Sequence, residues 1–409
     1  MDFEETEQEQ AFRAEVRAWL DAHAARRRAG ERSDHSYMPG DGSPEADERH
    51  LRACREWQHT VYDGGWAGIT WPVEAGGRGG AGWQQRIFNE EQSKYDVAVG
   101  VFAVGIGMAG PTIIAWGTAE QQQRYLPPML RGDEVWCQLF SEPGAGSDLA
   151  GLRTRGERDG DEWLVNGQKV WTSGAHYSDF GLLLARTNPD APKHKGITAF
   201  LLDMRVPGID VRPLRQITGA SHFNEVFLTD VRVPDACRVG PVDGGWRVAN
   251  TMLSNERAFI GGGGRVSARD IVALAQRTGA SSDPTMRQEL ARSYTRMQLI
   301  KWLGLRARSR KDQGLGPEAS VLKLAVSRRL AHDGDLVMAL QGAQAVLYDT
   351  DALQDGYWQQ QFLGQWSTRI GGGTEQIQRN VIGERVLGLP PEPRLDKELP
   401  FKDLPKSGG

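Results

Sequence analysis

Small hydroxyl residues and glycines gather at two places in the middle of the chain. The first is the run SEPGAGS at residues 141–147, and the second is Trp171-Thr172-Ser173. Each run follows a short stretch with the alternation of a β-strand. Glycines and small hydroxyl side chains let the backbone lie close to a planar ligand. The two runs therefore indicate a site for a planar ligand, and the alternative is that Gly144, Gly146 and Asp148 only form turns.

The residues between the two runs predict a β-hairpin. Residues 162–165 and 168–171 are apolar-polar runs separated by Asn166-Gly167. This dipeptide is the strongest short signal of a two-residue hairpin turn. We therefore expect residues 141–147 to share one pocket with residues 171–173.

Together, SEPGAGSD at 141–148 and NGQKVWTSG at 166–174 resemble the middle domain of the acyl-CoA dehydrogenase family. The resemblance covers nearly the whole chain, from the amino-terminal helix to VLGLP near the end. It implies an α+β fold with an amino-terminal helical domain (1–134), a middle β-barrel (135–241), a carboxyl-terminal four-helix bundle (242–388) and a tail (389–409). It also implies FAD-dependent α,β-dehydrogenation of an acyl-CoA thioester, with electrons passed to an electron-transferring flavoprotein.

The resemblance assigns a set of residues to FAD. They are Gln138, Phe140, Ser141, Gly146, Ser147, Trp171, Thr172, Ser173, Thr374 and Gln376. Within this set, the resemblance implies that Trp171 packs on the isoalloxazine ring and that the hydroxyl of Ser173 bonds its N5. Ser147 is expected to contact the thioester substrate as well.

Dehydrogenation of a thioester needs a carboxylate base for the α proton and hydrogen-bond donors for the thioester oxygen. Familiar members of the family carry the base in a YEGTxQIQ motif, and here Gly372 stands in its place within GGGTEQIQ. A second arrangement in the family puts the base on an earlier helix, just before an arginine. Glu256-Arg257 matches it, so the resemblance assigns the base to Glu256, a backbone N–H donor to Gly372 and substrate contact to Arg257. The alternative is that Glu256 and Arg257 are a solvated helix pair, and Glu375 is not expected to replace the missing glutamate.

Two departures from the family pattern concern the cofactor. Residues 277–288 lack the Arg-x-x-Phe-Gly-x-Pro motif that helps hold the FAD of a neighbouring subunit, and the usual paired glycines read Gly342-Ala343. Some bacterial relatives with such departures form mixed tetramers in which two different subunits share each flavin. We therefore expect a homotetramer, or a heterotetramer with a related subunit. Two other functions stay open, a non-catalytic partner subunit and a flavin oxidase or oxygenase on the same fold.

Composition limits the other possibilities. The chain has 409 residues, with 49 basic and 53 acidic side chains and a net charge of -4, so nothing indicates a nucleic-acid partner or an anionic membrane. The three cysteines and eight histidines lack metal-ligand spacing, and we expect no metal. The first twenty residues lack the features of a secretory signal, which predicts a cytoplasmic protein. The uncharged run at 97–116 is long enough to span a bilayer, but its glycines and proline favour a helix buried in the core.

Hydrophobic periodicity predicts helices, then strands, then helices. Helices are expected at 3–28, 51–62, 83–95, 97–117 and 119–129, with a surface loop at 30–48 and with Pro127-Pro128 ending the last helix. A period of two covers 135–241, with further turns at Asp159-Gly160, Pro189-Asp190 and Pro207-Gly208 and its clearest strands at 197–202 and 225–234. Helices return at 246–278, 284–311, 317–348 and 374–387. The tail after Gly388 is expected to be frayed or to lie on a neighbouring subunit.

Overall fold

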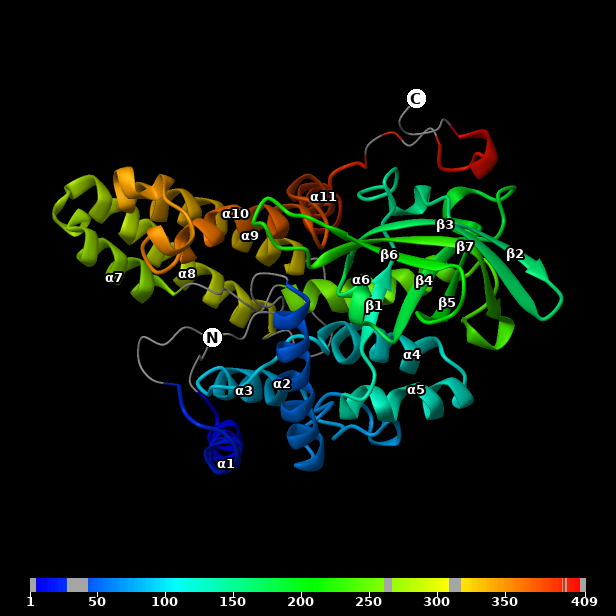
Figure 1. Ribbon diagram of the computed structural model, residues 1–409, viewed down its shortest axis with the longest axis horizontal. Coiled ribbons are helices and arrows are strands. Elements are labelled where there is room, and N and C mark those ends of the chain that lie inside the picture. Colours follow the sequence, from blue (N-terminus) through cyan, green and yellow to red (C-terminus); the bar gives the residue numbers. More distant parts are fainter. Residues whose placement is uncertain are drawn as a thin grey trace. The chain divides into compact units, whose positions relative to one another are not determined.

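The chain divides into two compact units. A computed structural model describes residues 5–27, 43–260, 267–308, 318–391, 393 and 396–404. The first unit comprises Met1–Leu253 with Leu395–Gly409, and the second comprises Ser254–Arg394. In Figure 1 the helices and strands of the first unit run from blue to green, and most helices of the second run from yellow to orange.

Five α-helices open the first unit. They are α1 (Glu7–His23), α2 (Pro44–Asp63), α3 (Gly82–Gln92), α4 (Gly110–Trp116) and α5 (Ala119–Arg131). Helix α2 begins seven residues before the predicted start at residue 51, because the Ser43 side chain accepts the Ala46 N–H and Pro44 occupies the first turn. The predicted surface loop therefore ends at Ser43, and its residues 30–42 lie outside the described part of the chain.

The uncharged segment at 97–117 is not one helix, as predicted, but a broken one. A π-helical turn occupies Gly105–Ala109, and α4 starts only at Gly110. A Cβ on Gly110 would lie 2.2 Å from the Trp71 ring, so the backbone can approach this ring only because residue 110 is glycine. Val101, Val104 and Ile113 are buried, as expected for a core segment. No described helix is long and apolar enough to cross a membrane.

Helix α5 continues through its two prolines. The prediction that Pro127 and Pro128 end it is wrong, since the helix extends to Arg131. An interior proline loses one helical hydrogen bond and crowds the preceding turn, but its φ is fixed near the helical value, so the helical backbone can persist at that cost. The helix ends instead at Gly132, whose left-handed φ of +90° reverses the chain direction.

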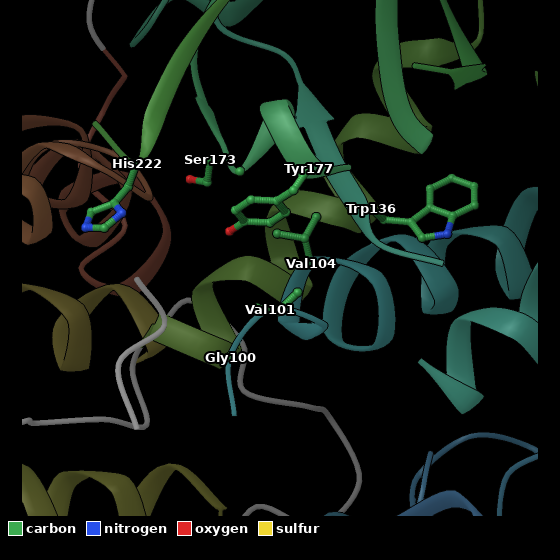
Figure 2. A pocket seen from close by; sticks show the side chains of 8 residues that line it. Gly100, Val101, Val104, Trp136, Ser173, Tyr177 and His222 are labelled. Atoms are coloured by element: carbon green, nitrogen blue, oxygen red, sulfur yellow. The ribbon is translucent and has the colours of Figure 1, made fainter. Parts of the chain in front are cut away.

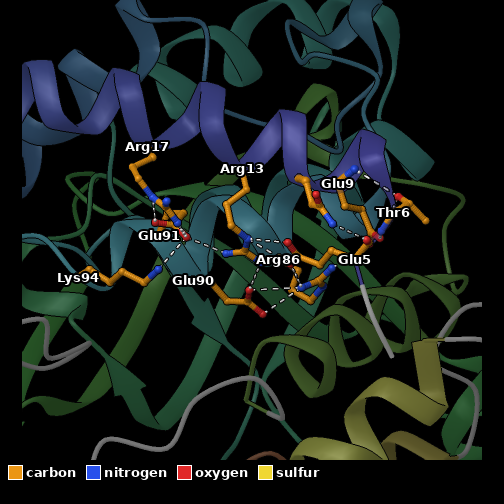
Figure 3. Close-up of polar contacts among 10 residues, drawn as sticks. Glu5, Thr6, Glu9, Arg13, Arg17, Arg86, Glu90, Glu91 and Lys94 are labelled. Carbon is orange, nitrogen blue, oxygen red and sulfur yellow. Dashed lines mark hydrogen bonds and ion pairs between the residues drawn. The ribbon is translucent and has the colours of Figure 1, made fainter. Parts of the chain in front are cut away.

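A buried carboxylate joins α1 to α3. The side chain of Glu91 is 1% exposed and pairs with Arg13 at 2.8 Å, Arg17 at 3.2 Å and Lys94 at 2.7 Å. Figure 3 shows Arg13 and Arg17 reaching Glu91 from α1 and Lys94 reaching it from the turn after α3. Burial raises the pKa of Glu91, but hydrogen bonds from Arg17, Lys94 and Arg13 outweigh it and lower the pKa to about 2. The Glu91 carboxylate therefore keeps its negative charge in the folded chain at neutral pH.

The strands of the first unit form one sheet. They are β1 (Trp136–Leu139), β2 (Arg155–Asp159), β3 (Glu162–Ser173), β4 (Phe180–Arg186), β5 (Ile197–Asp203), β6 (Ile209–Leu214), β7 (Phe223–Pro234) and β8 (Arg238–Val239). Their order is β6-β7-β3-β2-β4-β5-β8, and β1 pairs in parallel with β4. Among the described residues no pairing joins β6 to β8, so the strands form a sheet where a β-barrel was predicted.

Both faces of the central strand β4 are covered. Leu182 and Leu184 belong to the hydrophobic cluster shared with the amino-terminal helices, whereas Leu183 and Ala185 belong to a second cluster with Phe200 and its neighbours. Side chains alternate along a strand, which explains why every residue of β4 is buried. The first cluster fixes the helices of this unit against the sheet.

The predicted hairpin at Asn166-Gly167 does not exist. Strand β3 runs straight through this dipeptide, and its register with β7 shifts there, so the two residues form a β-bulge. Asn166 donates to the Asp230 carboxylate at 3.1 Å and accepts the Asp230 N–H at 2.9 Å. A Cβ on Gly167 would lie 2.7 Å from the Thr154 Cα, so glycine is needed for close approach and not for a turn. The real hairpin joins β2 to β3 at Gly160.

The second unit is helical. It contains the end of α6 (Gly245–Ile260), then α7 (Ala268–Thr278), α8 (Pro284–Arg308), α9 (Glu318–Gln341), α10 (Tyr357–Ile370) and α11 (Glu375–Val381), which continues as a π-turn at Ile382–Val386. The predicted helix at 246–278 is two helices, with residues 261–266 outside the described part. The predicted helix at 317–348 ends at Gln341 because Gly342 takes a left-handed φ of +57°. The sequence prediction missed α10, whose buried face mixes Trp358 with Gln359 and Gln365 and so lacks a clear apolar stripe.

Residues 396–404 of the tail, which were expected to be frayed or to lie on a neighbouring subunit, dock on the sheet of their own chain. Phe401 is buried, its N–H donates to the Ala191 carbonyl at 2.9 Å, and the Arg186 guanidinium stacks 3.8 Å from its ring centroid. Asp396 pairs with Lys193 at 2.5 Å. Figure 1 draws this segment in red. One buried aromatic ring and one ion pair are enough to order residues that composition alone marked as frayed.

Candidate active site

The structure brings the two small-residue runs together by a different route from the one predicted. Ser141 follows β1, and Trp171–Ser173 closes β3. The Val170 N–H donates to the Ser141 carbonyl at 2.9 Å, which places the two runs side by side. The adjacency therefore comes from a contact between β3 and the end of β1, and not from a hairpin.

A buried ion pair reinforces this junction. Lys169 is fully buried, and its Nζ donates to Glu142 Oε1 at 2.7 Å and to the Phe140 carbonyl at 3.1 Å. Glu142 also accepts the backbone N–H groups of Arg153 at 2.6 Å and Thr154 at 2.9 Å. Burial raises the pKa of Glu142, but the positive charge of Lys169 outweighs it and the net shift is downward. Burial lowers the pKa of Lys169, and the negative charge of Glu142 opposes that shift. The two side chains clamp the SEPGAGSD loop to β3.

Sequence reasoning missed Lys169 and Glu142, although a signal for both was present. Lys169 occupies an interior position of a strand whose neighbour Val170 is also buried, and a lysine is rarely buried without a partner. A carboxylate within the adjacent motif is the natural candidate for that partner. The need for a buried counter-charge could have linked the two runs before the fold was known.

Trp171 has a strained backbone and an exposed side chain. Its φ is +59°, a value that costs free energy for a bulky residue, and its side chain is 60% exposed. The register of β3 against β7 shifts between Lys169 and Thr172, so this bulge turns the indole outward. One edge of the indole contacts the Phe223 ring, with 5.9 Å between the centroids. The strained bulge therefore presents an open aromatic face beside Ser173.

The other assigned residues of the first unit differ in exposure. Phe140 is buried in the helix–sheet cluster, so its side chain supports the loop from inside. Ser147 and Gly146 are exposed, and a Cβ on Gly146 would meet no atom within 4 Å. Gln138 and Ser141 are half-buried. The exposed N–H and hydroxyl groups of the loop are thus free of bulky side chains, as a site for a large ligand requires.

A small cavity lies next to Ser173. It is lined by Gly100, Val101, Val104, Trp136, Ser173, Gly174, Tyr177 and His222. Figure 2 shows Ser173, Tyr177 and His222 extending toward the same space above the segment at 100–104. The Gly174 N–H donates to the His222 carbonyl at 3.0 Å, which fixes the start of β7 against the end of β3. The sequence did not single out Tyr177 or His222.

The side chain of Thr172 lies on the opposite side of the strand from this cavity. It is fully buried, its carbonyl accepts the Asn224 amide at 3.0 Å, and among the described residues its Oγ1 has no partner. Of the two hydroxyls in the WTS run, only that of Ser173 therefore lines the cavity. The cofactor contact assigned to Thr172 stays a prediction.

The remaining assigned residues lie in the second unit. Glu256 is half-buried near the end of α6, and the side chain of Arg257 lies outside the described residues. Gly372 belongs to the turn before α11, with φ +63°, and the Thr374 hydroxyl caps that helix by accepting the Ile377 N–H at 3.2 Å. Gln376 is exposed. Whether Glu256 and Gly372 act on a ligand held by the first unit stays a prediction.

Glu375 lies between two arginine side chains. Its carboxylate accepts from the Arg369 Nε at 3.1 Å and lies 4.0 Å from the Arg379 Nη2. Both oxygens of the carboxylate are thus engaged with guanidinium groups. That Glu375 does not replace the glutamate missing at position 372 stays a prediction.

Three sequence models of one family match consecutive parts of the chain. The acyl-CoA dehydrogenase amino-terminal domain matches residues 6–133, the middle domain matches 137–231 and the carboxyl-terminal domain matches 243–387. These matches together cover most of the chain.

Relatives and solved structures agree with the family models. The chain is 38% identical over 385 residues to "Acyl-CoA dehydrogenase IpdE1" of Mycobacterium tuberculosis, covering 93% of this chain and 98% of the relative. It is 42% identical over 335 residues to "Acyl-CoA dehydrogenase FadE34" of the same organism, covering 81% and 46%. The structure titled "Tcur3481-Tcur3483 steroid ACAD" superposes with a TM-score of 0.81 at 30% identity, covering 96% of this chain and all of that one. The "ChsE4-ChsE5 complex from Mycobacterium tuberculosis" gives 0.76 at 30% identity, covering 95% and 100%.

Proposed function

Because this chain belongs to the acyl-CoA dehydrogenase family, we propose that it oxidises the α,β C–C bond of an acyl-CoA thioester with FAD as the hydride acceptor. The observation that carries the proposal is the junction of the SEPGAGSD loop with β3, where Val170 contacts Ser141 and Trp171 is turned outward. The relatives are oxidoreductases that act on CH–CH groups, and this chain belongs to the same class of enzyme.

The residues at the junction fit a flavin. An isoalloxazine ring is flat, and the exposed indole of Trp171 offers a face on which it can stack. Ser173 and Ser141 supply hydroxyls, and Gly146 and Ser147 supply exposed backbone N–H groups for the phosphates. When bound, FAD supplies the two-electron acceptor. Denaturation of the active protein should release FAD, and release of FMN alone or of no flavin would contradict the assignment.

The chain's own residues supply the proton chemistry in this proposal. Glu256 takes the α proton of the thioester, and the Gly372 N–H donates to the thioester oxygen on which negative charge develops. Arg257 contacts the pantetheine or phosphate part of the substrate. The half-buried position of Glu256 supports its role, because partial desolvation strengthens a carboxylate as a base.

The substrate in this proposal is a bulky, steroid-like acyl-CoA. Two observations support it, namely the likeness to a structure titled "steroid ACAD" and the three glycines at 371–373, which place no side chain in the turn. The test is anaerobic flavin bleaching in a stopped-flow instrument with straight, branched, aromatic and steroid-like acyl-CoAs. Rapid bleaching by the steroid-like substrate alone would support the proposal, and faster bleaching by a straight chain would overturn the substrate class.

We further propose a tetramer of one or two chain types that passes electrons to an electron-transferring flavoprotein. Its support is the likeness to the two-protein "ChsE4-ChsE5 complex" and the exposed aromatic side chains Trp302 and Trp366 of the second unit. Sedimentation of the chain alone and co-expressed with a related subunit tests the assembly. If the protein became yellow with bound flavin only in the presence of a partner, and Glu256→Gln lost no activity, a non-catalytic subunit would be favoured. Oxygen consumption during turnover would instead favour an oxidase or oxygenase.

A further inference from the structure

The turn that carries Gly372 is held by side chains from two helices. Lys323 of α9 donates from Nζ to the Gly373 carbonyl at 2.7 Å. Gln378 of α11 donates from Nε2 to the Gly372 carbonyl at 3.0 Å and to the Gly373 carbonyl at 3.3 Å. A Cβ on Gly373 would lie 2.7 Å from that same Nε2. Both carbonyls are therefore engaged, which orients the two peptide groups that follow the Gly372 N–H, those of residues 372–373 and 373–374.

Lys323 is an unusual donor for this task because it is fully buried. Burying an ammonium group is costly unless opposite charge or hydrogen bonds compensate. Burial lowers the pKa of Lys323, and the negative charges of Glu375 and Glu256 act in the opposite direction. Glu375 is already shared between Arg369 and Arg379. The Lys323 charge therefore acts on both carboxylates, more strongly on Glu375 than on Glu256.

We propose that Lys323 is a positioning residue for the dehydrogenation, which holds the glycine turn through the Gly373 carbonyl and whose positive charge also acts on the Glu256 carboxylate. The inference rests on the proposed function, in which Glu256 is the base and the Gly372 N–H meets the thioester oxygen. Lys323 itself gains and loses no proton in the step. Its charge favours the ionised form of Glu256, which is the form that accepts the α proton.

The charged groups around this position are few among the described residues. Lys323 comes from α9, Glu375 and Arg379 from α11, and Arg369 from α10. Farther along α9, Arg329 pairs with Asp333 at 2.8 Å, and Asp333 also accepts from the Ser293 hydroxyl of α8 at 2.6 Å. This second buried cation lies on the same helix but contacts neither glycine of the turn in the described part of the chain. It therefore offers a matched control.

The experiment compares Lys323→Met with Arg329→Met in the full chain, together with its partner subunit if FAD requires one. The measured quantity is the rate of anaerobic flavin reduction by a saturating acyl-CoA as a function of pH. Lys323→Met is expected to slow reduction about tenfold or more, because the donor group is no longer held in place. It is also expected to move the acidic limb of the pH profile to higher pH, because Glu256 loses a favourable charge. Arg329→Met should lower thermal stability and leave that limb in place.

Two further variants separate positioning from folding. Lys323→Arg keeps the charge and should return the acidic limb toward its wild-type position. Lys323→Gln keeps a donor for the Gly373 carbonyl without a charge, so it should shift the limb even if Lys323→Met does not fold. The double variant Glu256→Gln with Lys323→Met should still be slower than Glu256→Gln alone, because the hold of Lys323 on the glycine turn does not act through Glu256.

The outcomes distinguish this inference from the function on which it rests. If Glu256→Gln abolishes flavin reduction but the Lys323 variants keep both the rate and the acidic limb of the wild type, the inference is overturned and the proposed function stands. If Glu256→Gln reduces flavin at the wild-type rate, the base is wrong and the role of Lys323 falls with it.

Discussion

At the scale of single residues, the proposed chemistry depends on one carboxylate. Glu256→Gln keeps the size of the side chain and removes its ability to accept a proton. General-base catalysis contributes about 10²–10⁴-fold, so flavin reduction should slow by that order while FAD stays bound. The measurement is anaerobic stopped-flow bleaching with FAD content determined on the same sample. Glu375→Gln is the control, and bleaching at a normal rate in Glu256→Gln would show that the base lies elsewhere.

Trp171 allows a second prediction at this scale, because its strain and its proposed role can be separated. A left-handed φ costs about 1–2 kcal/mol for a residue with a side chain and little for glycine. Trp171→Gly should therefore unfold at a temperature no lower than that of the wild type when both lack FAD, yet retain less FAD. Trp171→Phe keeps an aromatic face and should retain most of the cofactor. If Trp171→Gly bound FAD as the wild type does, the strained bulge would have no part in the cofactor site.

At the scale of elements, the buried pair Glu142–Lys169 joins the motif loop to β3. Lys169→Met leaves the Glu142 charge buried without its cation, and breaking a buried pair in this way costs about 3–5 kcal/mol of unfolding free energy. Glu142→Gln with Lys169→Met keeps a carbonyl acceptor for the Arg153 and Thr154 N–H groups and needs no cation. The double variant should therefore be more stable than Lys169→Met in urea unfolding. Equal stability of the two variants would mean that the unpaired charge is not the cause.

The docked tail gives the other prediction at this scale. Phe401 is buried against Arg186, so Phe401→Ala should cost about 2–4 kcal/mol by loss of packing and of the cation–π contact. The same change should make residues near 396–404 sensitive to limited proteolysis. Lys402→Ala, in the same segment, removes only a solvent-exposed ion pair with Asp190 and should change neither measurement. Protection of the tail in Phe401→Ala would place its anchor elsewhere.

At the scale of the whole molecule, stability should depend on acid through the α1–α3 network. The pKa of Glu91 is about 2 in the folded chain, below its ordinary value near 4.5. A lowered folded pKa stabilises the protein above the unfolded pKa, and that stabilisation is lost as pH falls through the folded value. The melting temperature should therefore fall as the pH is lowered below about 4.5. Glu91→Gln should show a weaker fall, whereas Glu48→Gln, an exposed partner of Arg52, should behave as the wild type does.

The sequence by itself determined the order of helical and β segments and the family, because periodicity and long motifs survive without knowledge of contacts. It also located the residues of the two motifs. The sequence did not predict where some helices and strands end, because contacts with other parts of the fold set the backbone geometry at those positions. Pro127 and Pro128 remain helical until Gly132 reverses the chain, and Asn166-Gly167 forms a bulge because β7 and Thr154 lie against it.

Only the tertiary structure decided how the site is assembled. The motifs meet through Val170 and Ser141 and through the Glu142–Lys169 pair, all of which are contacts between segments distant in sequence. Lys323 reaches Gly373 across 50 residues, and Phe401 docks on strands more than 200 residues earlier. Buried charges and single aromatic anchors of this kind leave no periodic signal, because one residue and its partner carry the whole interaction.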